Sequence, residues 1–199
     1  MSQINDLVNK ASEIMRSHNF VGIGSTRKVF KYENFVIKKH LHRIGYLQSV
    51  KEQEIYYELT QKNMAKFLAP ILYTNEDIAI QPYYQSLPLK NGETYNIDLD
   101  LDKRLTSELR TAIDEIDKKY DGFDLLDRGN YGLNQNGKLI LIDYGMTKML
   151  YESEWVPLAT AGILPQIFFE KCQVCRHNKE LRIYGENDKD RRCIGCGKE

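Results

Sequence analysis

The distribution of cysteine constrains this chain more than any other feature of its sequence. All four cysteines, Cys172, Cys175, Cys193 and Cys196, lie in the last 28 of 199 residues. They form two C-x-x-C pairs separated by seventeen residues. Cysteines confined to one short segment, in a chain whose first residues contain no hydrophobic signal core, favour metal binding over disulfide bonds. The sequence therefore predicts an intracellular protein with a metal-binding C-terminal module.

Two C-x-x-C pairs at this separation are typical of a Cys₄ zinc ribbon, in which each pair forms one of two tight turns around the metal. Four thiolates leave no open coordination position, so we expect a structural Zn²⁺ ion. Gly197 follows the second pair and would relieve the turn there. The intervening residues 181–192 are predicted to form a hairpin that depends on the metal. A redox role would need only one C-x-x-C pair, so two pairs favour metal binding. The simplest role for such a ribbon is a docking or stabilising module.

The overall composition is that of a globular protein. The chain is 42% hydrophobic and 28% charged, with 28 basic and 28 acidic residues. A balanced charge excludes general electrostatic attraction to nucleic acid, and the eight basic and five acidic residues of 171–199 are too small an excess to favour it locally. No apolar run approaches the roughly 18 residues that span a membrane. We expect a cytoplasmic protein with no membrane partner.

The hydrophobic patterns occur in an order that predicts an α+β fold. The predicted elements are a helix over residues 4–17, two or three strands within 20–38, a helix over 48–64, strands over 71–73 and 78–81, a helix over 100–120 and a hairpin over 130–142. The face of the helix over 100–120 carries Leu101, Leu105, Leu109, Ile113 and Ile116. Pro157, Gly162 and Pro165 indicate an irregular linker after residue 149.

The first candidate binding element is a glycine loop. Gly22 and Gly24 lie one residue apart between predicted strands, and Ser25 follows. Glycines there let backbone N–H groups approach a phosphate without an intervening Cβ atom. A Rossmann site would continue with a helix, whereas residues 29–37 have a strand pattern.

A lysine ends the next strand. If Val36 and Lys38 share a face, Lys38 points the same way as a core residue. A buried ammonium needs a carboxylate partner, which the following helix can supply from Glu52, Glu54 or Glu58. Surface charges on an amphipathic helix are the alternative interpretation for each glutamate.

The segment NYGLNQNGKLILIDYGM places Asn130 and Asp143 at the two ends of a predicted hairpin. Its turn, residues 134–137, contains an Asn-Gly pair that tolerates positive φ. Turn chemistry alone would explain polar residues at both ends. The alternative is that the hairpin holds two metal-binding oxygens at a fixed separation.

The order of these parts resembles the protein-kinase-like fold. Protein kinases carry G-x-G-x-x-G-x-V, V-A-I-K, a helix Glu, H-R-D-x-x-x-x-N and D-F-G in that order. The matching segments here are Gly22-x-Gly24-x-x-Arg27-x-Val29, with Arg27 in place of the third glycine, Val36-Ile37-Lys38, and Asp143-Tyr144-Gly145. The resemblance covers residues 18–150. It implies a reduced bilobal kinase-like fold with an N-lobe over 1–84, a C-lobe over 85–155, a linker over 156–170 and the zinc ribbon over 171–199.

The resemblance implies a role for each matching position. Lys38 would contact the phosphates of ATP, with Glu54 as its preferred partner. Asn130 and Asp143 would bind Mg²⁺, and Gly22, Gly24 and Ser25 would cover the phosphates. Residues 81–84 would be the hinge that faces the adenine, with Gln81 and Tyr83 as its candidate contacts.

The catalytic loop departs from the family pattern. The family places an Asp five residues before the Asn, and Leu125 stands there in this chain. FDLLDRGN resembles the D-L-H-x-x-N of small bacterial and phage-type kinase-like proteins, with one residue inserted and the histidine lost. Asp124 is the preferred catalytic base and Asp127 the second choice. The A-P-E segment and most of the substrate-binding helices of a full protein kinase are also missing.

These features support three hypotheses of different classes. The first is an ATP- and Mg²⁺-dependent phosphotransferase that acts on a protein, in a bacterial or phage-infected cell. The second is a pseudokinase-like binding or regulatory module. The third is a zinc-ribbon adaptor for a protein or, less favoured, a nucleic acid. Phosphorylation of a small molecule, as in antibiotic kinases, also stays open.

Overall fold

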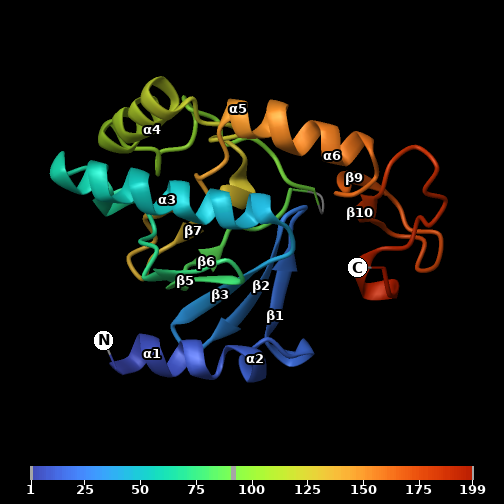
Figure 1. Cartoon of the computed structure of the whole chain (residues 1–199). Coiled ribbons are helices and arrows are strands. Elements are labelled where there is room, and N and C mark those ends of the chain that lie inside the picture. Colours follow the sequence, from blue (N-terminus) through green and yellow to red (C-terminus); the bar gives the residue numbers. More distant parts are fainter. Residues whose placement is uncertain (1, 91–92, 199) are drawn as a thin grey trace.

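The computed structural model describes residues 2–90 and 93–198, and it confirms the predicted mixed α+β class. Within these residues the strands form three antiparallel sheets (Figure 1). The largest has the order β1-β2-β3-β5-β4. Its strands are β1 (Phe20–Ile23), β2 (Arg27–Tyr32), β3 (Phe35–His40), β4 (Tyr73–Thr74) and β5 (Ile78–Pro82).

The N-terminal helices cover the outer face of this sheet. The helix predicted over 4–17 is divided into α1 (Ser2–Asn9) and α2 (Ala11–Ile14), followed by the 3₁₀ turn η1 (Ser17–Asn19). Leu7, Ala11 and Ile14 pack there against Ile37 and Ile80. Because side chains alternate along a strand, the residues next to Ile37 on β3 point to the opposite face. That inner face is the one that carries Lys38.

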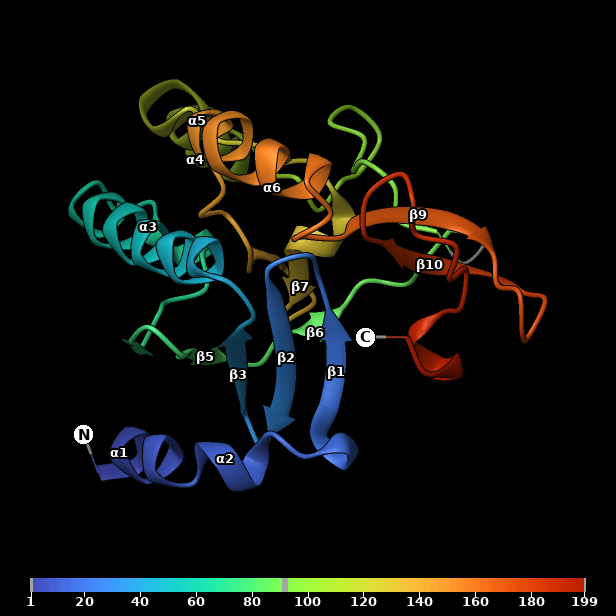
Figure 2. The ribbon, with the colours of Figure 1, turned by 45° about the vertical axis from the view of Figure 1, so that its right-hand side comes forward.

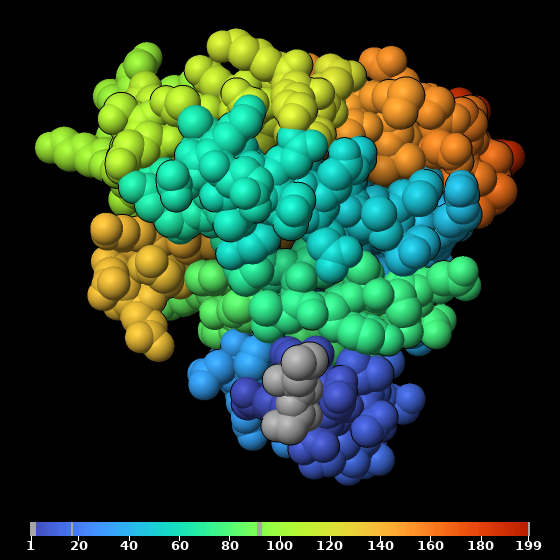
Figure 3. All heavy atoms as spheres, turned by 60° about the vertical axis from the view of Figure 1, so that its left-hand side comes forward, coloured from blue at the N-terminus to red at the C-terminus, as the bar shows by residue number. Residues whose placement is uncertain are grey.

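Helix α3 (Arg43–Gln61) is shared by the two halves of the chain. Its N-terminus is capped by His42, whose ring nitrogen accepts a hydrogen bond from the Ile44 N–H at 3.2 Å. Its C-terminal part contributes Ile55 and Leu59 to the core of the second half. Figure 3 shows α3, in teal, lying across the molecule between the N-terminal elements and α4. Residues near the middle of α3 therefore lie at the junction of the two halves.

The second half contains α4 (Ser107–Tyr120) and a small sheet of order β6-β7-β8. Its other elements are β6 (Gln85–Ser86), β7 (Tyr131–Leu133), β8 (Leu139–Leu141) and the 3₁₀ turns η2 (Ala65–Phe67) and η3 (Arg128–Asn130). The predicted start of the long helix at residue 100 is wrong. Thr106 caps α4 by accepting a hydrogen bond from the Leu109 N–H, and Leu101 is 78% exposed.

The hairpin predicted between Asn130 and Asp143 is confirmed as β7 and β8. In its turn, the Asn134 side-chain oxygen accepts hydrogen bonds from the N–H groups of Asn136 at 2.9 Å and Lys138 at 3.0 Å. Gly137 adopts a φ of 70°, a left-handed conformation that costs glycine little.

The linker predicted over 156–170 is wrong, because most of it has regular structure. A helical segment consists of α5 (Lys148–Leu150), the π-helical turn η4 (Tyr151–Trp155) and α6 (Val156–Thr160). Pro157 is the second residue of α6 and follows directly on η4, so its missing N–H removes one hydrogen bond of a continuous helical segment. Strand β9 (Gln166–Lys171) then begins within the predicted linker.

The C-terminal module is a hairpin of β9 and β10 (Asn178–Ile183), followed by a loop and the 3₁₀ turn η5 (Ile194–Cys196). The prediction of a hairpin over 181–192 is therefore wrong. The hairpin lies earlier in the chain, where Leu181 of β10 pairs with Phe168 of β9. Figure 2 shows β9 and β10 beside the tip of the β1–β2 hairpin. The module thus lies against the N-terminal sheet.

No helix within residues 2–90 and 93–198 combines the length and the apolar character that crossing a membrane requires.

Candidate functional site

A cavity of about 390 Å³ lies where the glycine loop, the ends of the β7–β8 hairpin, η4 and the C-terminal module meet. Seven residues that the sequence nominated line it: Gly24, Ser25, Lys38, Asp124, Asp127, Asn130 and Asp143. These residues come from segments up to 119 positions apart in the sequence, between 24 and 143. The fold therefore brings most of the predicted site together in one cleft.

Lys38 is buried on the inner face of β3 and has a carboxylate partner. Its Nζ atom lies 3.3 Å from Oε2 of Glu52 and donates a hydrogen bond to the Ile142 carbonyl at 2.7 Å. Burial lowers the pKa of Lys38, and Glu52 opposes this effect. The prediction that Lys38 points inward is confirmed, and the next residue, Lys39, is exposed.

The predicted pairing of Lys38 with Glu54 is wrong. Glu54 is exposed and pairs with Lys51 at 2.5 Å, whereas Glu52 has no exposed surface. Residues two positions apart on a helix point in directions that differ by about 200°, so Glu52 and Glu54 cannot face the same side. The signal was present in the sequence: Glu52 lies three residues before Ile55 and seven before Leu59, on the apolar stripe of α3.

Arg27 is a site residue whose role sequence reasoning missed. Its buried guanidinium forms ion pairs with Glu52, at 3.0 Å, and with Asp143. The two carboxylates raise its pKa despite burial. Arg27, Lys38, Glu52 and Asp143 thus form a charge-balanced group of two cations and two anions. The only sequence signal was the arginine standing where the third glycine of the loop motif is expected.

Asp143 and the two residues after it are held against α3. The Tyr144 N–H donates to Oε1 of Glu52 at 3.3 Å, and the Tyr144 hydroxyl donates to the Ala69 carbonyl at 2.7 Å. A Cβ atom on Gly145 would lie 2.0 Å from the Gln48 carbonyl oxygen, so only glycine fits there. Desolvation raises the pKa of Asp143, but Arg27 and Lys38 outweigh it and the net pKa is lowered. Asp143 is therefore ionised in the cleft.

Asn130 lies directly beside Asp143. Its carbonyl accepts hydrogen bonds from the N–H groups of Ile142, at 2.7 Å, and Asp143, at 3.4 Å. Its side-chain NH₂ donates to the Asp124 carbonyl at 2.7 Å. The amide oxygen of Asn130 and the carboxylate of Asp143 are hard ligands of the kind that Mg²⁺ prefers, and both residues line the same cavity.

Asp124 and Asp127 have different surroundings. Asp127 caps η3: its carboxylate accepts hydrogen bonds from the Gly129 N–H at 2.6 Å and from the Thr94 hydroxyl at 2.8 Å. Asp124 has a φ of 58°, and no hydrogen bond to its carboxylate is found among the described residues. Partial desolvation, together with the negative charges of Asp127 and Asp143, raises the pKa of Asp124 to about 6. Asp124 is therefore the carboxylate suited to proton transfer.

The glycine loop joins two antiparallel strands, as predicted. The Gly24 N–H donates to the Arg27 carbonyl at 2.9 Å, which closes the turn. Gly24 and Ser25 line the cavity, but Gly22, paired with Val29 in the sheet, does not. Within residues 2–90 and 93–198 the Ser25 N–H has no hydrogen-bond acceptor, so it remains a donor for a ligand.

Gln81 and Tyr83, the candidate adenine contacts, do not line this cavity. Gln81 is 2% exposed, on β5, and its side-chain oxygen has no hydrogen-bond partner among the described atoms. The Tyr83 N–H donates to the Asn34 carbonyl at 2.8 Å, and its ring contacts the Lys31 ammonium at 3.9 Å. The structure does not bring these two residues into the cleft with the others.

A column of three aromatic rings forms one wall of the cleft. Phe123 stacks on Tyr151 with ring centroids 4.0 Å apart, and Tyr151 stacks on Trp155 at 5.0 Å. The Trp155 indole N–H donates to the Ser25 hydroxyl at 3.0 Å, at the tip of the glycine loop. Because this segment was predicted to be a linker, sequence reasoning missed its part in the cleft.

The C-terminal module forms another wall. Ile167 on β9 and Glu180 on β10 line the cavity, facing the side that holds Asp124 and Asp127. Arg182, also on β10, donates a hydrogen bond to the Gly24 carbonyl. The module is thus part of the cleft and not a separate appendage.

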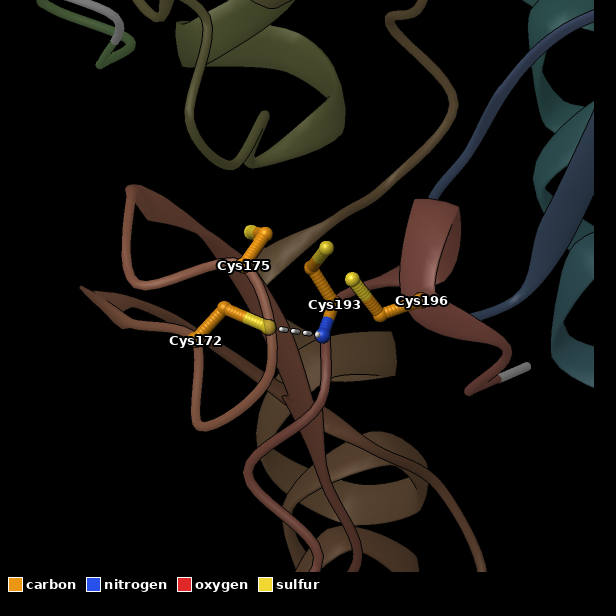
Figure 4. A group of neighbouring side chains, drawn as sticks. All are labelled: Cys172, Cys175, Cys193 and Cys196. Carbon is orange, nitrogen blue, oxygen red and sulfur yellow. Dashed lines mark hydrogen bonds between the residues drawn. The ribbon is translucent and has the colours of Figure 1, made fainter.

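The four cysteines converge at the end of the β9–β10 hairpin (Figure 4). Their Sγ atoms all lie within 4.8 Å of one another. Tetrahedral coordination with Zn–S bonds of about 2.3 Å requires sulfur atoms roughly 3.8 Å apart, so the cluster is compatible with Zn²⁺. The Cys172 sulfur accepts hydrogen bonds from the N–H groups of Cys193 at 3.3 Å and Val174 at 3.4 Å. Gly197 adopts a φ of 95°, consistent with the predicted turn after the second pair.

The comparisons assign no family to this arrangement. No protein-family model matches the chain, and no curated protein matches it significantly.

Proposed function

We propose that this protein is an ATP- and Mg²⁺-dependent phosphotransferase of reduced protein-kinase-like fold that acts on a protein. The observation that carries the proposal is the buried Lys38–Glu52 ion pair in one cleft with Asn130, Asp143 and Asp124. Each group has a distinct use in phosphoryl transfer: a cation for phosphates, two hard metal ligands and one carboxylate with a raised pKa.

The donor set of the cleft fits the phosphate end of a nucleotide. Lys38 would contact the phosphates, the Ser25 N–H would donate to them, and Asn130 with Asp143 would hold Mg²⁺. Bound Mg²⁺ would neutralise charge on the phosphoryl group. The cavity volume of about 390 Å³ falls within the usual range for small-molecule sites. The adenine contacts at Gln81 and Tyr83 stay a prediction, since neither residue lines the cavity.

Asp124 would act as the general base. Its carboxylate would take the proton from an acceptor hydroxyl while the hydroxyl oxygen forms a bond to the γ-phosphorus and the bond from that phosphorus to ADP breaks. A base whose pKa is near 6 is mostly ionised at neutral pH and still accepts a proton readily. The carboxylate of Asp127 already accepts hydrogen bonds from the Gly129 N–H and the Thr94 hydroxyl, which favours a structural role.

A protein acceptor is supported by the surface beside the cleft. Strand β9 exposes Ile167 (40%), which lines the cavity, whereas the neighbouring Phe168 points to the opposite face of the β9–β10 hairpin. An exposed apolar side chain at the edge of the cleft offers a contact for a polypeptide acceptor.

The second candidate is a pseudokinase-like module that binds nucleotide without transferring phosphate. The ion pair between Arg27 and Asp143 favours it, because a fixed cation occupies the carboxylate that Mg²⁺ would need. The two candidates differ in whether the nucleotide displaces Arg27.

Transfer of labelled phosphate from γ-labelled ATP tests the proposal. The wild type should label itself or a protein in an extract when Mg²⁺ is present, and Asp143→Asn should abolish the label. Asp6→Asn, on the exposed surface of α1, is the matched control and should retain it. If ATP binds but no label transfers with any divalent metal, the pseudokinase-like function is correct instead. If ATP does not bind, both are wrong.

A further inference from the structure

One buried side chain joins the C-terminal module to the glycine loop. Arg182 on β10 is 3% exposed. One terminal nitrogen of its guanidinium donates to the Gly24 carbonyl, 158 residues away in sequence, and the other donates to the Tyr184 hydroxyl at 3.1 Å. Figure 2 shows the β1–β2 hairpin reaching toward β9 and β10 with this loop at its tip.

The contact sets the direction of a peptide group. In a trans peptide the carbonyl and the next N–H point in opposite directions. With the Gly24 carbonyl held by Arg182, the Ser25 N–H points away from the module. Ser25 lines the cavity, and its N–H has no acceptor within the described ranges. Arg182 thus orients a backbone donor of the loop that a phosphate could use.

The module's own core holds Arg182 in place. The preceding residue, Leu181, is fully buried against Cys172 and Cys193 and forms a β-bridge with Cys193. A second close approach links the module to the turn after α6, since a Cβ atom on Gly185 would lie 3.2 Å from Cα of Gly162. The cysteine cluster, Leu181 and Arg182 therefore form a continuous path to the loop.

We infer that Arg182 is the positioning residue of the glycine loop, and that through it the metal-bound module sets the affinity of the cleft for nucleotide. The nucleotide part of this inference rests on the proposed function. Arg182 touches no ligand itself: it acts by fixing the Gly24–Ser25 peptide. The module is then required for binding at the cleft in addition to any docking role.

The chain contains a probe of this contact. Trp155 is its single tryptophan, and the indole N–H is bonded to Ser25 beside Gly24. A loop released from Arg182 should loosen this bond and shift the emission of Trp155. The emission reports loop position in the absence of nucleotide, which separates the two parts of the inference.

The test compares full-length Arg182→Met and Arg182→Lys with the wild type. Arg191→Met is the matched control, because Arg191 belongs to the same module and, among the described residues, its side chain makes only an exposed contact to Glu170 at 3.9 Å. Zinc content shows whether the module is folded, and calorimetric titration with ATP and Mg²⁺ gives the affinity. Arg182→Met should weaken ATP binding about tenfold, the effect of losing one charge-assisted hydrogen bond, and shift Trp155 emission. Arg182→Lys should restore part of both, and Arg191→Met should match the wild type.

Removing zinc from the wild type with a chelator should produce the same emission shift. The inference is overturned if zinc-loaded Arg182→Met keeps wild-type emission and wild-type ATP affinity. If Arg182→Met fails to retain zinc, Arg182→Lys decides by the same two readouts. A wild type that does not bind ATP refutes the proposed function, whereas the emission of the Arg182 variants still decides whether Arg182 holds the loop.

Discussion

Arg27 and Asp143, 116 residues apart in sequence, form an ion pair inside the cleft. Arg27 extends from β2 past the Glu52 carboxylate of α3 to reach the end of the β7–β8 hairpin. One side chain thus connects the three segments that would surround the phosphates. Any divalent metal at Asp143 must compete with it.

Replacing Arg27 with methionine should raise the affinity of the cleft for a divalent metal alone. The metal would no longer compete with the Arg27 guanidinium for the Asp143 carboxylate. Mn²⁺ binding measured by paramagnetic resonance should therefore tighten about tenfold, the effect of one charge-assisted hydrogen bond. Arg43→Met, at the exposed start of α3, should leave Mn²⁺ binding unchanged. Equal affinities in all three proteins would show that Asp143 does not bind the metal.

Glu52 and Glu54 provide a matched pair for stability. Glu52→Gln would leave Arg27 and Lys38 as buried cations with one carboxylate between them, so the free energy of unfolding should fall by roughly 3–5 kcal/mol. Glu54→Gln removes an exposed contact to Lys51 and should cost less than about 0.5 kcal/mol. Urea denaturation measures both. Similar losses for the two variants would contradict the observed division of roles on α3.

The pKa of Asp124 predicts how phosphate transfer depends on pH. A carboxylate with a pKa of about 6 is protonated below that pH and cannot accept a proton, so kcat should fall as pH decreases through 6. Asp124→Asn should abolish transfer, while Asp127→Asn should lower stability, keep transfer and shift the pH profile toward lower pH, because the charge of Asp127 contributes to the raised pKa of Asp124. Because the folded pKa lies above the ordinary value, Asp124 destabilises the fold as pH rises from about 4 to 6. Asp124→Asn should therefore fold at least as stably as the wild type at neutral pH.

Glycines in the two family-like motifs should respond differently to alanine. At Gly145 the added Cβ atom would meet the Gln48 backbone oxygen at 2.0 Å, and thermal unfolding should show severe destabilisation, above roughly 3 kcal/mol. At Gly22 nothing lies within 4 Å and φ is not positive, so Gly22→Ala should fold like the wild type. A stable Gly145→Ala protein would contradict the close approach of α3.

Removal of zinc should unfold the end of the C-terminal module first. The purified protein should contain one zinc per chain, and replacement with Co²⁺ should give the absorption of a tetrahedral thiolate site. Cys193→Ser should lose the metal and lower the melting temperature, whereas Ser153→Ala, on the exposed side of η4, should do neither. A metal-free wild type with an unchanged melting temperature would show that the cluster is not structural.

Local chemistry predicted the parts of the fold that depend on short stretches of sequence. The β7–β8 hairpin followed from its Asn-Gly turn, and the cysteine cluster followed from the spacing of its ligands. The inward direction of Lys38 followed from strand alternation. The turn and the direction of Lys38 depend on residues within a few positions of one another, and the cysteine cluster depends on the tetrahedral geometry of its metal.

The remaining features depend on tertiary contacts that a single sequence does not display. The sequence could identify Glu52, and not Glu54, as the partner of Lys38 only from its position on the apolar stripe of α3. The prediction instead followed the helix length expected from the kinase motif. Prolines and a glycine made residues 156–170 look irregular, although Pro157 lies within the helical segment that η4 and α6 form. The contacts of Arg27 and Arg182 involve partners 116 and 158 residues away, and no local pattern encodes them.

The π-helical turn η4 makes the position of Trp155 sensitive to chain length. A π-helical turn contains one residue more than the α-helical turn it replaces. Deleting a single residue between Tyr151 and Trp155 should let this stretch relax to an ordinary helix while Trp155 keeps roughly its direction toward Ser25, because the π-helical turn already accommodates the extra residue. Inserting one more residue has no such turn to absorb it. Since each residue of an α-helix contributes about 100° of rotation, a one-codon insertion here should turn Trp155 away from Ser25 and so act on the distant β1–β2 loop.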